Sequence, residues 1–169
     1  SKNIKSQKFL VEQLQTHSVE REYSAIVYGH MISGGSINEP IGRDSKDRIK
    51  QSISAKGKEA KTHYRAIDRF KNHTHVKDIL ETGRTHQIRV HLSYIGHPLI
   101  GDPMYGGRVR FPKKASQELK DKLTNFQRQA LHSKKLTLIH PMSGKSMSWK
   151  ADLPSDMQEL LNILRKFDS

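Results

Sequence analysis

The sequence of 169 residues contains no cysteine, which excludes a disulfide framework, a thiolate zinc site and a cysteine nucleophile. No apolar run approaches the roughly 20 residues that are needed to span a bilayer. The basic first residues are followed by neither a sustained apolar segment nor a small-residue cleavage site, so a secretory signal is not indicated. These absences favour a cytoplasmic protein that contacts no membrane.

Positive charge dominates the composition. Lys and Arg total 30 against 17 for Asp and Glu, which gives a formal charge of +13 and a pI near 10.0. Such a charge indicates a polyanionic partner, because phosphate groups attract cations whatever the sequence. Charge by itself leaves RNA, DNA and an acidic membrane surface open. The length of the chain predicts one compact unit.

Apolar periodicity predicts an α+β fold, with a predominantly antiparallel mixed sheet and flanking helices. We expect a short amphipathic helix around residues 9–14 that ends near His17. Residues 20–29 predict a central strand, because neither face is strongly polar. The later elements are a basic loop or edge hairpin over 38–58, a hairpin of strands 60–70 and 75–81, a helix from Gly83 to Gly96, a helix from 119 to 130 capped by Ser116, a strand pair 136–140 and 146–151, and a last helix begun by a capping box of Ser155 and Gln158.

The ten histidines raise the question of a metal site, and their spacing argues against one. His86 and His91 are five residues apart, so they do not share a helix face at one-turn spacing, and no HExxH motif occurs. His73 and His75 fall in an expected hairpin turn. We therefore expect no metal ion.

Polar side chains are densest in residues 81–92, which read ETGRTHQIRVHL. On the expected helix, His86 and Arg89 are neighbours at i and i+3. The free N–H groups of a helix start also favour a phosphate or carboxylate nearby. Taken singly, Arg89 would be a surface arginine and Tyr23 a core tyrosine, whereas structural and functional roles for His86 stay open.

The longer stretch ETGRTHQIRVHLSYIGHPLIGDPMYGG resembles the corresponding part of the RluA/RluD family of ribosomal RNA pseudouridine synthases. The segments REYSAIVYGH, ALHS and HPMSGK occur in the order that this family uses, so the resemblance runs from about Lys8 to the last helix. It implies the pseudouridine synthase catalytic fold and conversion of uridine to pseudouridine in large-subunit (23S) ribosomal RNA. No cofactor is implied, because the isomerisation involves no net redox change.

The resemblance implies two catalytic residues. Tyr23 matches the tyrosine that stacks against the target uracil, and it is a candidate proton acceptor. Stacking would return about 1 to 3 kcal/mol of the cost of unstacking the base. Arg89 matches the arginine that pairs with the catalytic aspartate, whose pKa a neighbouring guanidinium keeps low.

Four substrate-binding candidates follow from the same resemblance. Arg84, His86 and Gln87 match the rest of the motif that contains Arg89, with roles that are partly structural and partly substrate-facing. Leu131 matches the leucine of an active-site LHA segment, although this chain reads Leu-His-Ser there, which puts the packing of the third residue in doubt.

The nucleophile of the family is missing from the sequence. It belongs to an HRLD motif upstream of the strand tyrosine, and HRLD does not occur here. Asp68 and Asp102 lack that context, so we assign neither as nucleophile. We expect residues 1–169 to be the C-terminal portion of a catalytic domain, without the HRLD segment or the S4-like RNA-binding domain, and to be inactive alone.

A non-catalytic RNA-binding module on the same scaffold is the alternative function. The basic tracts Lys56–Lys58 and Arg108–Lys114 are either solvated loops or contacts to RNA phosphates, and the net charge favours the second interpretation. We expect ribosomal RNA as the partner and a monomer, in which exposed strand edges could still pair between chains.

Overall fold

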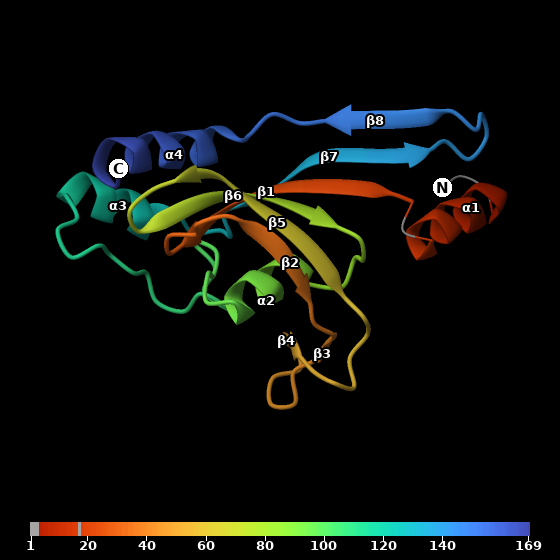
Figure 1. Ribbon diagram of the computed structural model, residues 1–169, viewed down its shortest axis with the longest axis horizontal. Helices are drawn as coiled ribbons and strands as arrows, with labels where there is room; N and C mark the ends of the chain where they lie inside the picture. The colour runs from red at the N-terminus through yellow and green to blue at the C-terminus, as the bar shows by residue number, and fades with distance from the viewer. Residues whose placement is uncertain (1–3, 17) are drawn as a thin grey trace.

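The computed structural model describes residues 4–16 and 18–169 (Figure 1). Its elements are α1 (Ile4–Gln15), β1 (Glu20–Tyr28), β2 (Gly34–Asn38), β3 (Ile41–Arg43), β4 (Gln51–Ile53), β5 (Lys61–Arg69), β6 (His73–Leu80), α2 (Gln87–Tyr94), α3 (Gln117–Asn125), β7 (Leu131–Ile139), β8 (Ser146–Lys150) and α4 (Ser155–Phe167). Within the described residues, a six-stranded sheet has the order β2-β5-β6-β1-β7-β8, with every neighbouring pair antiparallel, and β3 and β4 form a separate two-stranded sheet. The predicted α+β fold is confirmed.

Strand β1 is central, as its weak polarity predicts. It lies between β6 and β7, and its residues from Ser24 to Tyr28 are all buried. Because side chains alternate along a strand, β1 supplies both faces of the sheet. Ile26 and Tyr28 belong to an apolar cluster with α3 and α4, whereas Ala25 and Val27 belong to a second cluster with α2.

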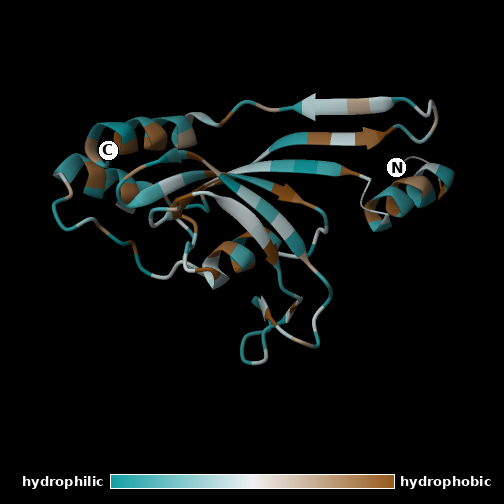
Figure 2. Ribbon diagram, viewed as in Figure 1, coloured by the Kyte–Doolittle hydropathy of each residue, from teal (hydrophilic) through white to brown (hydrophobic). Residues whose placement is uncertain are grey.

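Helices therefore cover the two faces at different places. Figure 1 shows α3 and α4 together at one end of the sheet, α1 at the far end, and α2 below the strands. Along α4, apolar and polar residues alternate in stripes (Figure 2), which suits a helix with one buried face. Its buried side chains are Met157, Leu160, Leu161 and Leu164.

The helix ends confirm one predicted cap and overturn another. The Ser116 hydroxyl accepts a hydrogen bond from the Leu119 N–H at 3.2 Å, as expected of an N-cap. Helix α3 ends at Asn125, earlier than predicted. The capping box of Ser155 and Gln158 is wrong, because Pro154 is the N-cap of α4 and the Gln158 amide donates to a loop carbonyl instead.

The first helix ends at Gln15, close to the predicted position, and His17 lies outside the described residues. Gln13 joins the helix to the last residue of β7, because its side chain donates to the Ile139 carbonyl at 2.8 Å and accepts from the Ile139 N–H at 2.7 Å. Across residues 4–16 and 18–169, no helix is both long enough and apolar enough to cross a membrane.

The segment 38–58 contains the small β3–β4 sheet, so the hairpin interpretation holds and the plain loop does not. This sheet projects below the main sheet (Figure 1). Ile41 anchors it by packing with Ala60 and with Val90 of α2. The projection is therefore fixed to the helix that carries the densest polar motif.

Candidate active site

The loop between β6 and α2 is organised around the side chain of Gln87. Its Oε1 accepts from the Thr82 hydroxyl at 2.8 Å and from the Arg84 N–H at 2.9 Å. Its Nε2 donates to the Lys61 carbonyl and the Thr62 hydroxyl, both at 3.0 Å. Gln87 is 2% exposed and binds the loop to β5, so a contact between Gln87 and substrate stays a prediction without structural support.

Helix α2 begins later than the sequence predicted. Its first residue is Gln87, and His86 before it has a left-handed backbone with φ of 56°. A helix opening after Gly83 is therefore wrong, because Gln87 holds residues 82–84 in a hydrogen-bonded turn. A side chain at position 83 would meet the Arg21 guanidinium, which would have to shift to make room for it.

Arg89 points to an acid within this chain. Its Nε donates to Asp102 Oδ2 at 2.7 Å and its Nη2 to Asp102 Oδ1 at 2.9 Å. The Arg89 side chain is 12% exposed and that of Asp102 is 0% exposed. The hydrogen bonds to Asp102 raise the pKa of the Arg89 guanidinium. Arg89 therefore has an acidic partner within these 169 residues, and its pairing with the catalytic aspartate of the family stays a prediction.

Two further side chains complete what we call the aspartate cluster, formed by His86, Arg89, Asp102 and Tyr105. The Arg89 guanidinium lies over the Tyr105 ring, 4.8 Å from its centroid. The Tyr105 hydroxyl lies 2.8 Å from His86 Nδ1 and accepts from the Gln51 N–H at 2.9 Å. Burial is the main cause that lowers the pKa of His86, and the charge of Arg89 adds to it.

A second group, the sheet cluster, consists of Arg21, Tyr23, Arg84 and Leu131. Tyr23 is opposite Ser133, and Leu131 is opposite Ala25, in the β1–β7 register. Alternation along each strand therefore places Tyr23 and Leu131 on one face, where both pack against the apolar cluster under α2.

Arg21 lies two residues before Tyr23 on the same face, and its Nη2 donates to the Glu81 carbonyl at 3.1 Å. Burial is the main cause that lowers the pKa of the Arg21 guanidinium, and the positive charge of Arg84 lowers it further. Tyr23 raises the pKa of Arg21 and so opposes these two effects. Arg84 is held by its Nε–H bond to the Glu59 carbonyl at 2.8 Å. Arg21 thus lies close to both Tyr23 and Arg84.

The structure places five of the six predicted residues in these two clusters, and Gln87 instead binds the loop between them to β5. Among the described residues, no hydrogen bond, ion pair or ring contact joins Arg89 to Tyr23. Arg21 was not predicted as a site residue, and neither Asp102 nor Tyr105 was predicted to contact Arg89. The GDPMYGG motif, which supplies both, was the one available signal for the aspartate cluster.

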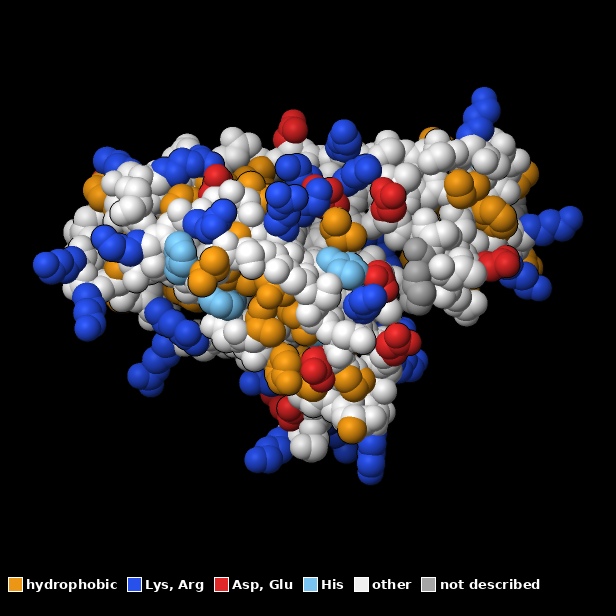
Figure 3. All heavy atoms as spheres, in the orientation of Figure 1, with side chains coloured by type: hydrophobic (Ala, Val, Ile, Leu, Met, Phe, Trp, Pro, Cys, Tyr) orange, Lys and Arg blue, Asp and Glu red, His pale blue; other side chains and the backbone are white. Residues whose placement is uncertain are grey.

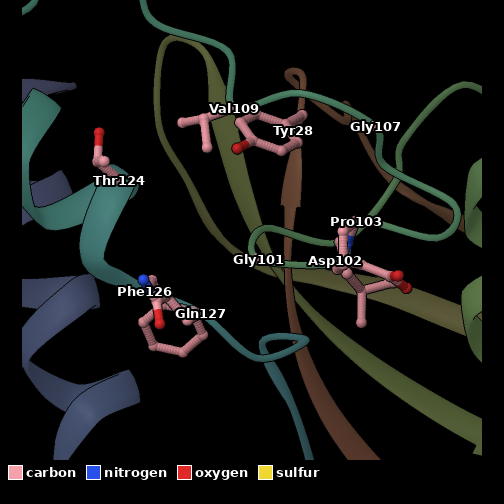
Figure 4. Close-up of a pocket in the computed structure, with 10 residues that line it drawn as sticks. Tyr28, Gly101, Asp102, Pro103, Gly107, Val109, Thr124, Phe126 and Gln127 are labelled. Atoms are coloured by element: carbon pink, nitrogen blue, oxygen red, sulfur yellow. The ribbon is translucent and has the colours of Figure 1, made fainter.

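A cavity of about 210 Å³ lies beside Asp102 (Figure 4). It is bounded by the end of α3 and by the loop of residues 101–109. The Tyr28 hydroxyl points into this space, whereas the Asp102 carboxylate is turned away from it. That orientation agrees with the ion pair to Arg89. The cavity is thus separate from the acid and base groups of the aspartate cluster.

A basic cleft lies between the β3–β4 sheet and the loop before α2. It is a hollow of about 600 Å³, and its wall contains Arg43, Arg48, Lys56, Lys58 and Arg84. Figure 3 shows Lys and Arg side chains projecting around this lower part of the molecule. Such a concentration of cations favours a polyanion. In the part of the chain that the structure describes, no three acidic, histidine or cysteine side chains are grouped as metal ligands.

Comparisons with known proteins show the family of this chain. A model of the family described as RNA pseudouridylate synthase matches residues 1–94. Ribosomal large subunit pseudouridine synthase D of Pseudomonas aeruginosa is 52% identical over 166 residues, which cover 98% of this chain and 52% of that protein. The Escherichia coli protein of the same name is 49% identical over 165 residues, which cover 98% of this chain and 51% of that protein.

Solved structures agree as well. Human RNA Pseudouridylate Synthase Domain Containing 4 superposes with a TM-score of 0.73 at 25% identity, covering 96% of this chain and 69% of that one. Human RNA Pseudouridylate Synthase Domain Containing 1, at 22% identity and a TM-score of 0.68, shares the fold. The chain spans about half the length of the curated relatives it matches. It belongs to the RluA/RluD family of RNA pseudouridine synthases.

Proposed function

We propose that this chain is part of an enzyme that isomerises uridine to pseudouridine in large-subunit ribosomal RNA, and that its nucleophilic aspartate comes from sequence outside these 169 residues. The relatives named ribosomal large subunit pseudouridine synthase D support the reaction and the RNA class. The expected HRLD motif does not occur in the chain. The proposal includes the assignment of residues 1–169 to the C-terminal portion of the catalytic domain.

The observation that carries the proposal is the sheet cluster. Tyr23 is partly exposed beside Arg21, which also interacts with the second cation Arg84. Among the described residues, the buried Nε of Arg21 has no hydrogen-bond partner. A buried cationic donor without a partner is costly, so this position favours an incoming carboxylate or phosphate.

The chemistry assigns a task to each part. The N1–C1′ bond of uridine breaks, the C5–C1′ bond forms, C5 loses its proton and N1 gains one. The incoming aspartate would attack or stabilise the sugar as oxocarbenium character develops. Tyr23 would stack on the flipped uracil and accept the C5 proton, and Leu131 would line the base site. Arg89 matches the arginine that pairs with the catalytic aspartate in the family. Because Asp102 already engages Nε and Nη2 of Arg89, the guanidinium would contact the incoming aspartate through Nη1.

Neither Asp102 nor Asp68 is available to replace the missing nucleophile. Asp102 is sequestered by Arg89, and its side chain is 0% exposed. Asp68 contacts Arg165 at 2.9 Å and His75 at 3.4 Å. We therefore expect the isolated chain to be inactive while it retains contacts to RNA through the basic cleft. We expect a monomer in the cytoplasm, although β2 and β8 leave both edges of the sheet open to strand pairing.

Tritium release from C5-labelled uridine in ribosomal RNA tests the proposal. The chain alone should release none. A chimera should release tritium when a segment that carries the family's HRLD motif precedes this chain, and changing the aspartate of that motif to asparagine should abolish release. Turnover by the chain alone contradicts the missing nucleophile. A folded chimera that binds RNA without turnover contradicts the isomerase function and favours a non-catalytic RNA-binding module.

A further inference from the structure

Asp78 on β6 occupies the position directly opposite Tyr23. The β1–β6 register pairs Tyr23 with Asp78, and the β5–β6 register pairs Asp78 with Tyr64. Side chains in such pairs leave the same face of the sheet, with Cβ atoms about 5 Å apart. The carboxyl group of Asp78 thus lies in a row between two tyrosine side chains.

The surroundings of Asp78 are apolar. Its neighbours on the same face of β6 are Val76 and Leu80, and these two belong with Tyr23 and Tyr64 to the apolar cluster under α2. Asp78 is 0% exposed, and neither carboxyl oxygen has a hydrogen-bond partner among the described residues. An unpartnered polar group in this setting lowers stability, so packing does not account for an aspartate here.

Burial raises the pKa of Asp78 to about 8. The titratable groups on this face are Arg21 and Tyr23 on β1 and Tyr64 on β5, and His91 of α2 reaches it through the Thr62 hydroxyl of β5. His91 is engaged by the Thr62 hydroxyl at 2.9 Å and the Glu39 carbonyl at 2.9 Å, so it offers Asp78 no free partner. The group is consequently neutral at pH 7 and becomes a buried anion above pH 8.

We propose that Asp78 is a positioning residue for Tyr23. Asp78 supports the Tyr23 ring in its site only while the Asp78 carboxyl carries its proton. The neutral carboxyl packs as part of the apolar floor beside the ring. Loss of the proton places an uncompensated charge in that floor, and the charge draws in water or moves Asp78 and the ring apart. The uracil as occupant of the site rests on the proposed function; the link between Asp78 and Tyr23 does not.

NMR titration of the 169-residue chain between pH 6 and 9.5 tests the link. The Asp78 carboxyl signal, assigned by its loss in Asp78→Asn, should titrate near pH 8. The Tyr23 ring signals, assigned by their loss in Tyr23→Phe, should shift with the same midpoint. That shift should vanish in Asp78→Asn and persist in the exposed control Asp152→Asn. Asp78→Leu, which also cannot ionise, replaces the asparagine variant if that variant does not fold.

The affinity of a short uridine-containing RNA gives a second readout. If only the protonated form is competent, about one tenth of the protein binds at pH 9, so affinity should fall about tenfold from its value below pH 7. Asp78→Asn should remove that decrease. Tyr23 signals that ignore the Asp78 titration, or an equal loss of affinity in both proteins, overturn the inference. An NMR link combined with RNA binding that Tyr23→Phe leaves unchanged at every pH supports the inference and contradicts the proposed uracil site.

Discussion

Arg89 and Asp102 form a two-point ion pair whose carboxylate has no exposed surface. The pair joins α2 to the loop after it, because Arg89 lies on the helix and Asp102 lies in the loop. Asp102 also organises the loop itself, since it accepts from the N–H groups of Met104 and Tyr105 at 3.1 and 3.3 Å. Arg89 therefore has a structural role in this chain besides any role in catalysis.

The change Asp102→Ala should lower the free energy of unfolding by about 3 to 5 kcal/mol, because it leaves a largely buried guanidinium without its partner. Urea denaturation measures the loss. Asp156→Ala is the matched control, since it breaks the two-point pair with Arg128 at an exposed site and should cost less than about 1 kcal/mol. Equal losses in the two variants would show that burial of the first pair has no energetic consequence.

The change Gln87→Ala should lower the free energy of unfolding by about 2 kcal/mol or more, because it removes partners from several buried polar groups of the loop and β5. Hydrogen exchange should show faster opening of residues 82–86. The exposed Gln117→Ala, which loses one contact to Asp121, should change stability by less than about 0.5 kcal/mol. An unchanged loop in Gln87→Ala contradicts this account.

Asp78 predicts an unusual dependence of stability on pH. Its pKa in the folded state, about 8, lies above the ordinary value of 3.8. The folded state therefore binds more protons than the unfolded state between these values, and the stability contributed by the group falls by about 1 kcal/mol per pH unit as pH rises through that window. Asp78→Leu should be more stable at pH 7 and lack this slope in urea midpoints at pH 5, 7 and 9. A parallel slope in both proteins contradicts the assignment.

The basic cleft predicts how RNA binding responds to salt. Lys58→Gln should weaken binding and reduce the slope of log K against log salt by about 1, because one fewer counterion is released. Lys8→Gln on α1, at the far end of the sheet (Figure 1), should leave the slope unchanged. Filter binding to a ribosomal RNA fragment over a series of salt concentrations provides the measurement. Equal effects of the two changes would remove the cleft from the RNA interface.

The sequence was sufficient wherever a local pattern decides the structure. The apolar character of residues 24–28 placed β1 at the centre of the sheet, and the serine at position 116 placed the start of α3. It was insufficient wherever a contact between residues that are distant in the sequence determines the structure. Gln87 moves the start of α2 because it binds Lys61 and Thr62, about 25 residues earlier.

The site shows the same division. The motif around Arg84 and Arg89 identified the family, yet the partner of Arg89 depends on how the loop after α2 folds back. Nor does the sequence reveal that Asp78 is buried, because an aspartate in a half-polar strand is usually read as solvent-facing. Arg21 was missed since its nearness to Tyr23 and Arg84 depends on the conformation of the loop.

The rate of tritium release by the HRLD-bearing chimera, with either Tyr23 or Tyr64 changed to phenylalanine, tests the central claim most directly. Both tyrosines flank Asp78 on one face of the sheet, so they form a matched pair. If Tyr23 accepts the C5 proton, Tyr23→Phe should slow release at least about 100-fold, the usual minimum for loss of a general base. Tyr64→Phe should stay near the parent rate, and a Tyr23→Phe chimera that matches the parent would contradict the site proposed around Tyr23.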